Sequence, residues 1–286
     1  MNIYKLKDWI DITYLDWYQL SSNPNAIDLL TEHKDKINWS ALSSNPNAIV
    51  LLSQNIDKID WPNLSSNPNA IYLLKKYPIL INWHNLSSNP NAIDLLTENK
   101  NKINWSTLSS NPNAIDLLTE NIHNIDWSML STNPNAIDLL TENIHNIDWY
   151  RLSYNPNAIN LLSQHQNKID WSMLSSNPSA YELLINNSSK IDLKWIVINP
   201  NKKIIDYFLK NNLEKINWNL LSDNSSAIEL LHQNKHKIFW YLISRNENIF
   251  EINYSMIKKR TNIFSEEMIA KIFHPSKIIE LLSYDN

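Results

Sequence analysis

The chain has 286 residues, of which 43% are hydrophobic and 19% charged, and this composition can supply a buried core. It contains no cysteine, so neither disulfide bonds nor cysteine-based zinc sites are expected. The net charge of −4 argues against a nucleic-acid-binding domain, which would be strongly basic. The first residues lack the apolar stretch of a signal peptide, and no apolar run is long enough to cross a membrane. We therefore expect an intracellular protein without a membrane anchor.

Glycine is absent, although average usage would give about twenty glycines in a chain of this length. The chain is instead rich in Asn, Ile and Lys, whose codons are rich in A and T, and this bias indicates an A+T-rich genome. Helices often end with a glycine in the left-handed conformation. The helices of this chain must therefore end with asparagine or in some other way.

Tryptophan recurs at a constant interval along the chain, and a proline follows each tryptophan at a second constant interval. The tryptophans lie at positions 17, 39, 61, 83, 105, 127, 149 and 171, and the prolines at positions 24, 46, 68, 90, 112, 134, 156 and 178. Both series therefore share one period of 22. Self-similarity at a period of this size is typical of solenoids and other repeat arrays.

Each unit contains two helix starts. In the pair Asn111-Pro112, asparagine is a preferred N-cap and proline suits the first helical position. The helix is predicted to run about ten residues toward Asn121, with Ala114, Ile115 and two leucines on its buried face. We likewise interpret the asparagines at positions 45, 67, 89, 111 and 133 as helix caps, not as ligand-binding groups.

The second start is an Asp or Asn directly before tryptophan, as in Asp126-Trp127. This segment is about six residues long, which favours one α-helical or 3-10 turn. We predict that the tryptophans form a buried structural ladder; the alternative is a row of exposed aromatic binding sites. The predicted ladder consists of Trp39, Trp61, Trp83, Trp105, Trp127, Trp149 and Trp171.

The resulting fold class is all-α: a right-handed α-solenoid of about eleven 22-residue units, each with a short α or 3-10 turn and a longer α-helix. We expect an N-terminal cap at residues 1–16, regular repeats at 17–186 and degenerate repeats at 187–253. Trp195, Trp218 and Trp240 mark the degenerate units. Residues 254–286 are predicted to form a C-terminal cap with helices near 265–273 and 275–283. At ~9 Å per layer, the stack is expected to be about 100 Å long.

The run Leu108-Ser109-Ser110-Asn111-Pro112-Asn113-Ala114-Ile115-Asp116-Leu117-Leu118 and its copies carry a family resemblance. The unit resembles the leucine-rich repeat variant and short HEAT-like class, in which an α-helix alternates with a short 3-10 helix. It is also similar to uncharacterised Asn-Pro repeat proteins of giant viruses of amoebae. The resemblance covers residues 17–253 and implies binding through a long surface. It supplies no catalytic residues.

No pattern in the sequence indicates an enzyme. Phosphate-binding loops, dinucleotide fingerprints and nucleophile elbows all need glycine, which this chain lacks. His123 and His145 lie in equivalent positions of adjacent units, about 9–10 Å apart, which is too far to share one zinc ion. Pairs such as Asp94 and Glu98 recur in successive units, whereas active sites are normally single. We expect no catalytic residues, no metal and no cofactor.

The exposed positions of three consecutive longer helices are acidic, and they predict a ridge that docks a basic protein segment. The ridge consists of Asp94, Glu98, Asp116, Glu120, Asp138 and Glu142. Tyr72 and Tyr181 are candidate aromatic anchors beside it. The alternative is a solvated helix face, in which the acids favour the helix dipole and Lys102 pairs with Glu98.

The leading functional hypothesis is therefore a non-enzymatic scaffold or adaptor for protein–protein interaction, acting in the cytoplasm, which for a viral protein is that of the host. One alternative is a single-strand RNA-binding repeat protein, but that class needs a basic groove where this chain has an acidic column. Another alternative is a structural component of a virus particle.

Overall fold

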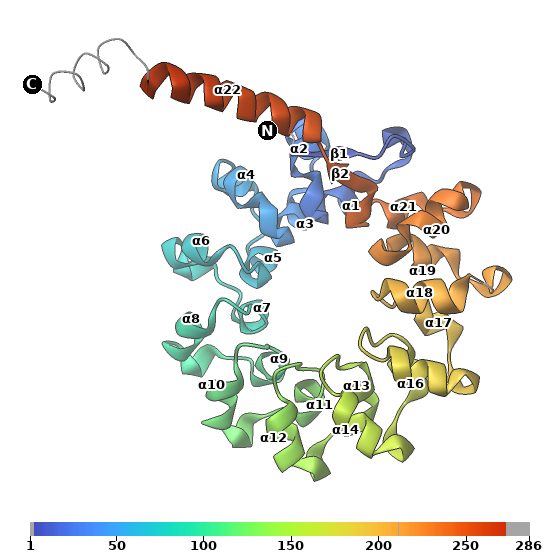
Figure 1. Ribbon diagram of the computed structural model, residues 1–286. Coiled ribbons are helices and arrows are strands. Elements are labelled where there is room, and N and C mark those ends of the chain that lie inside the picture. The colour runs from blue at the N-terminus through green and yellow to red at the C-terminus, as the bar shows by residue number, and fades with distance from the viewer. Residues whose placement is uncertain (1–2, 211, 273–286) are drawn as a thin grey trace, which may run out of the picture.

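The computed structural model describes residues 3–210 and 212–272, and it shows helical repeats arranged in a ring (Figure 1). Most units have a short α-helix that begins at tryptophan, an Asn-Pro turn, a second α-helix and a 3-10 turn; the turns of the last two units lack the proline, and the last unit has no second α-helix. We call the first helix the inner helix and the second the outer helix, because they lie on the inner and outer sides of the ring (Figure 1). The predicted all-α solenoid of eleven units is confirmed within the described ranges.

Units are numbered 1 to 11 by their inner helices. These are α1 (Trp17–Ser22), α3 (Trp39–Ser44), α5 (Trp61–Ser66), α7 (Trp83–Ser87), α9 (Trp105–Ser109), α11 (Trp127–Leu130), α13 (Trp149–Tyr154), α15 (Trp171–Ser175), α17 (Leu193–Ile196), α19 (Trp218–Asp223) and α21 (Trp240–Ile243). The outer helices are α2 (Ile27–Glu32), α4 (Ile49–Ser53), α6 (Ile71–Lys76), α8 (Ile93–Thr97), α10 (Ile115–Thr119), α12 (Ile137–Glu142), α14 (Ile159–Gln164), α16 (Tyr181–Asn186), α18 (Lys202–Leu209) and α20 (Ile228–Gln233).

Short 3-10 turns connect most outer helices to the next inner helix. They are η3 (Lys34–Lys36), η5 (Ile56–Lys58), η6 (Pro78–Leu80), η7 (Lys100–Lys102), η8 (Ile122–Asn124), η9 (Ile144–Asn146), η10 (Gln166–Lys168), η11 (Ser188–Lys190), η12 (Leu213–Lys215) and η14 (Lys235–Lys237). Further 3-10 turns are η1 (Ile12–Tyr14), η2 (Pro24–Ala26), η4 (Pro46–Ala48), η13 (Ser225–Ala227) and η15 (Glu247–Ile249).

The outer helices are shorter than the sequence predicted. In unit 5, Asn111 Oδ1 accepts a hydrogen bond from Asn113 N, and Ala114 N donates to Asn111 O, which closes a tight turn. The α-helix begins only at Ile115. Asn-Pro therefore caps a separate turn ahead of the outer helix, and α10 itself has five residues.

The helices end without glycine and without left-handed backbone, since no described residue has a positive φ. An asparagine side chain takes over part of the C-capping function. Asn99 Nδ2 donates to Leu95 O, and Asn121 Nδ2 donates to Leu117 O, at 2.9 and 2.8 Å. Each asparagine thereby satisfies a carbonyl that the end of the helix leaves free.

The fully buried core is a set of leucine and alanine columns, such as Leu108, Leu118 and Ala114 in unit 5. The tryptophans of the predicted ladder pack against this core but are only half-buried. Leucine side chains, and not the indoles expected from the sequence, therefore form the fully buried column. The indoles cover the edge of the core and keep part of each ring accessible.

The asparagine of each Asn-Pro pair is buried and connects neighbouring units. Asn111 Nδ2 in unit 5 donates to Ser87 O and Asn89 O of unit 4, at 3.1 and 3.0 Å. The predicted capping role is present, but these bonds between units were not foreseen. The same pair of bonds to the preceding unit is made by Asn45, Asn67, Asn89, Asn133, Asn155, Asn177, Asn199, Asn224 and Asn246.

A buried serine forms a second connection between units. Ser109 Oγ donates to Trp105 O in its own helix and accepts from Asp126 N of the next unit, at 2.8 and 3.0 Å. In unit 9, Val197 stands where the other units have this serine.

We expect Ser109→Val to lower the free energy of unfolding by about 1–3 kcal/mol, because Asp126 N loses its partner in a half-buried site. Valine keeps the shape of the side chain, and Val197 shows that the ring accepts it at this position. Urea unfolding followed by circular dichroism measures the change. Ser110→Ala, next to it in the sequence, removes only a bond within its own helix, from Ser110 Oγ to Thr107 O, and is the control.

The first and last units are joined by the contacts that join neighbouring units elsewhere. Asn23 Nδ2 donates to Ser244 O and Asn246 O, both at 3.2 Å. Asp16 N donates to Ser244 Oγ at 2.8 Å, as Asp126 N does to Ser109 Oγ. The interface between units 11 and 1 thus repeats the internal interfaces, although no chain segment links them. We call this interface the closing joint.

Two short strands reinforce the closing joint. Strand β1 (Tyr4–Leu6) pairs antiparallel with β2 (Phe250–Ile252), in the register Tyr4↔Ile252. The prediction of an open stack about 100 Å long is therefore wrong, because the curvature brings the ends together. Residues 1–16, expected as an N-terminal cap, contribute β1 and η1 to this joint.

Helix α22 (Tyr254–Ile272) leads away from the ring (Figure 1). Its residues 254–263 are exposed. The sequence predicted a helix that starts near residue 265, but α22 begins at Tyr254 and passes through that position. The second predicted helix, near 275–283, lies outside the described residues.

Unit 9 departs from the other units. Its inner helix starts at Leu193, one regular period after Trp171, with Asp192 as the N-cap and Asn199 in the asparagine column. Trp195 therefore lies beyond the position that tryptophan takes elsewhere. Helix α18 has eight residues, and unit 10 begins only at Trp218, so unit 9 is longer than the regular repeat.

Candidate protein-interaction surfaces

The six acids of the predicted ridge lie in α8, α10 and α12 or directly after them, and all six are exposed. These are three successive outer helices (Figure 1). One ion pair at the ridge joins two neighbouring units: Lys100 Nζ of unit 4 lies 3.6 Å from Glu120 Oε2 of unit 5. This is an exposed ion pair, and such pairs contribute little to stability.

Lys102 does not form the ion pair with Glu98 that the alternative of a solvated helix face includes. Its ammonium lies 4.4 Å from the centre of the Trp83 ring, on the indole of its own unit, and not beside Glu98. The same contact recurs in other units, with Lys58 over Trp39, Lys190 over Trp171 and Lys237 over Trp218. The lysines of these turns thus cover indoles and leave much of the ridge charge unpaired.

The two predicted aromatic anchors differ in exposure. Tyr72 on α6 is 74% exposed, one unit before the ridge. Tyr181 on α16 is only partly exposed and packs edge-on against Tyr207, with ring centres 6.2 Å apart. Only Tyr72 is therefore placed to contact a partner that also reaches the acids.

Further exposed apolar side chains occur in units 2 and 3, and they were not among the residues predicted to bind a partner. Val50 takes the equivalent position on α4 and is 71% exposed, while Ile79 in η6 is 92% exposed. We call Val50, Tyr72, Ile79 and Leu80 the apolar patch. Large apolar side chains exposed in two neighbouring units favour an interaction site in this part of the ring. The signal was present in the sequence, because position 50 is Val and position 79 is Ile where most units have polar residues.

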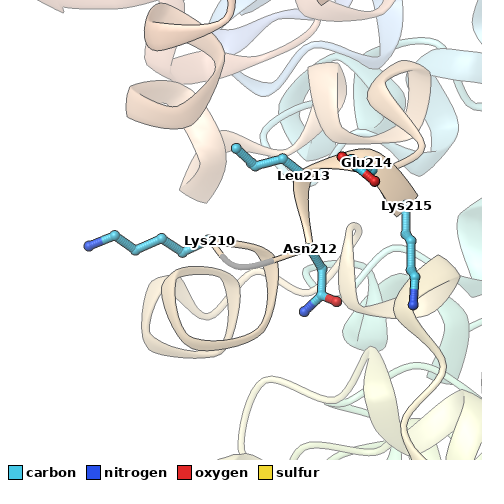
Figure 2. A pocket seen from close by; sticks show the side chains of 5 residues that line it. All are labelled: Lys210, Asn212, Leu213, Glu214 and Lys215. Atoms are coloured by element: carbon cyan, nitrogen blue, oxygen red, sulfur yellow. The ribbon is translucent and has the colours of Figure 1, made fainter.

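A cleft lies at unit 9, and it was not predicted. Two cavities of about 620 and 380 Å³ share Lys210 and Asn212. The larger cavity is also lined by Ile191, Leu193 and Phe208, which form an apolar floor. The smaller cavity is lined by the residues of η12; in Figure 2 the side chains of Asn212 and Lys215 extend to the same side, and Lys210 points away.

A third cavity of about 290 Å³ lies between α18 and α20 and carries most of the charge near the cleft. Lys202 Nζ lies 3.5 Å from Asp206 Oδ2 and also bonds to Glu229. The hydrogen bond to Glu229 raises the pKa of Lys202, and the charge of Asp206 adds to this, so Lys202 stays protonated. Asp206 and Glu229 are therefore both paired with Lys202.

Two other kinds of site are absent from the part of the chain that the structure describes. No three His, Asp or Glu side chains come close enough together to hold a metal ion. Helices with the length and apolarity needed to span a membrane do not occur there either. His123 and His145 are both exposed, in η8 and η9.

Fold and surfaces together define the class of the protein: a helical repeat protein closed into a ring, with charged and apolar surface patches. Comparison of the chain with protein-family models, with curated proteins and with solved structures found no match. The function proposed below is therefore inferred from the structure.

Proposed function

We propose that the ring is a non-enzymatic scaffold that binds a protein partner through the acidic ridge and the apolar patch. The observation that carries this proposal is the position of six exposed acids on three successive outer helices, directly after the exposed apolar residues of units 2 and 3. In this proposal the chain belongs to the short HEAT-like class of repeat proteins and acts in the cytoplasm.

The partner that fits these surfaces is a segment with apolar side chains next to several Lys or Arg residues. The apolar side chains would cover Tyr72 and Val50, and desolvated aromatic contacts of this kind supply much of the affinity at interfaces. The basic residues would lie along the ridge, where charge complementarity mainly increases the association rate and the specificity. Lys75 and Lys76, between the two surfaces, would favour a neutral or acidic residue at the junction.

Reversal of the ridge charge is expected to weaken binding of such a partner strongly. The variant carries Glu98→Lys, Glu120→Lys and Glu142→Lys, and the wild type and the variant are used to purify bound proteins from native cells with quantitative mass spectrometry. Partners that use the ridge should fall at least about tenfold, because three attractive contacts become repulsive. Their binding to the wild type should weaken as salt rises.

The matched control changes three exposed acids outside the ridge, Asp35, Asp57 and Glu182, to lysine and should retain the partners. Equal recovery with the ridge variant and the wild type would contradict the proposal. Salt-dependent retention of RNA by the wild type, lost when lysines of the 3-10 turns are replaced, would instead favour the RNA-binding alternative.

A further inference from the structure

Unit 9 lacks the indole that the other units place between the inner helix and the following 3-10 turn. Leu193 is equivalent to the tryptophans by its hydrogen bonds. Its N-cap Asp192 accepts from Ser172 Oγ, as Asp148 accepts from Ser128 Oγ, and Asp192 N donates to Ser175 Oγ of the preceding unit. A leucine is much smaller than an indole, so the position is underfilled.

The residues that border the indole in other units are present in unit 9. Lys215 is equivalent to Lys190 and Lys237, whose ammonium groups lie 4.4 and 4.8 Å from the centres of their indoles. The backbone confirms the equivalence, because Lys215 N donates to Asn212 O as Lys190 N donates to Asn187 O.

Asn212 takes the other bordering position. In three units an aromatic ring stands there against the indole: His33, Tyr77 and His165 have ring centres 5.1, 5.3 and 5.0 Å from those of their tryptophans. Asn212 lines both cavities of the cleft, Leu193 lines the larger one, and Lys215 lines the smaller one. The larger cavity thus adjoins the leucine that replaces the indole, and Asn212 separates it from the smaller cavity beside Lys215.

The floor of the cleft is also unusually open. Ile191 is only partly buried, whereas its equivalents Ile169 and Ile216 are 8% and 7% exposed. Helix α18 is longer than the outer helices of the regular units, and it presents Tyr207 and Phe208 to the cavity. The larger cavity has Asp206 as well as these apolar residues in its lining, and Lys215 lines the smaller cavity next to it. Apolar side chains with a lysine nearby suit a flat aromatic ring, because the cation is attracted to the face of the ring.

We infer that the cleft of unit 9 is a docking site for an aromatic side chain of a partner protein, with tryptophan as the best fit. The partner's ring lies over Leu193 and Ile191, and Lys215 contacts its face. The chain itself shows this arrangement several times, with its own tryptophans as occupants. The site is separate from the acidic ridge, so a partner could use either surface or both.

The test uses N-acetyl-L-tryptophanamide as the probe and the full chain, labelled for NMR. We expect saturable shift changes at the amides of Leu193, Asn212 and Lys215, with a dissociation constant of about 1 mM, as is typical of a ligand this small. N-acetyl-L-leucinamide should bind at least about tenfold more weakly, because it lacks the π face. Equal binding of the two probes would overturn the inference.

Two substitutions test the site itself. Leu193→Trp supplies the missing indole and should raise the unfolding temperature while it abolishes binding of the probe. Lys215→Met, a surface change, should weaken binding several-fold, whereas Lys237→Met, at the equivalent position over Trp218, should leave it unchanged. Undiminished binding by both Leu193→Trp and Lys215→Met would overturn the inference. The triple ridge variant should bind the probe normally, so failure of the ridge proposal does not affect this result.

Discussion

Replacement of Asn111 by aspartate is expected to lower the free energy of unfolding by about 3–5 kcal/mol, a large part of the stability of a typical domain. Aspartate keeps the oxygen that caps Asn113 N but loses both Nδ2 donors. Ser87 O and Asn89 O then face a buried carboxylate where they had hydrogen-bond donors. Burial of a charge without a partner adds to the cost.

Urea unfolding monitored by circular dichroism measures this loss. Asn113→Ala is the control, because Asn113 is exposed and its Nδ2 makes a single bond, to Pro90 O at 2.9 Å. That change should cost no more than about 1 kcal/mol. Similar losses for Asn111→Asp and Asn113→Ala would show that the buried asparagine column does not hold the units together.

Disruption of the closing joint is expected to open the ring. The variant lacks residues 1–7, which removes strand β1, and carries Asn23→Asp, which removes both Nδ2 bonds to unit 11. No peptide bond links units 11 and 1, so the chain can spread toward the span of about 100 Å expected for an open stack. Small-angle X-ray scattering should then show a larger radius of gyration and maximum dimension.

The variant Asn111→Asp is the matched control for this experiment. It removes the same two bonds between units 4 and 5, but the chain itself connects those units, so a folded sample should keep the dimensions of the closed ring. A joint variant with wild-type scattering would mean that the other contacts of the joint suffice. Among these are the stacked rings of Trp9 and His232, with centres 4.8 Å apart.

The repeat and its two helices were predictable because they depend on local chemistry. Asn-Pro pairs, Asp before Trp and the spacing of leucines report caps and buried faces within one unit. The position of the acids on three successive outer helices followed from the same period. Asn111 also bonds to the preceding unit, and this second role could not be predicted from the sequence. Helix capping alone already accounts for an asparagine at this position.

Ring closure was not predictable, because it depends on the sum of small rotations at every interface between units. A few degrees more or less at each joint would give an open spiral. The cleft was missed for a different reason: Trp195 was assigned to the repeat position by residue type. Spacing pointed to Leu193, which lies one regular period after Trp171 and has Asp192 before it. The constant spacing therefore already indicates that this unit lacks its tryptophan.

Closure also constrains how the gene can change. An open solenoid gains or loses a whole repeat by recombination with little penalty, because each repeat contacts only its neighbours. Here eleven units share one full rotation, about 33° each, and a twelfth would demand about 30° at every interface. Duplication of one repeat therefore strains the whole circle, and selection should hold the copy number constant even while individual surface residues vary freely.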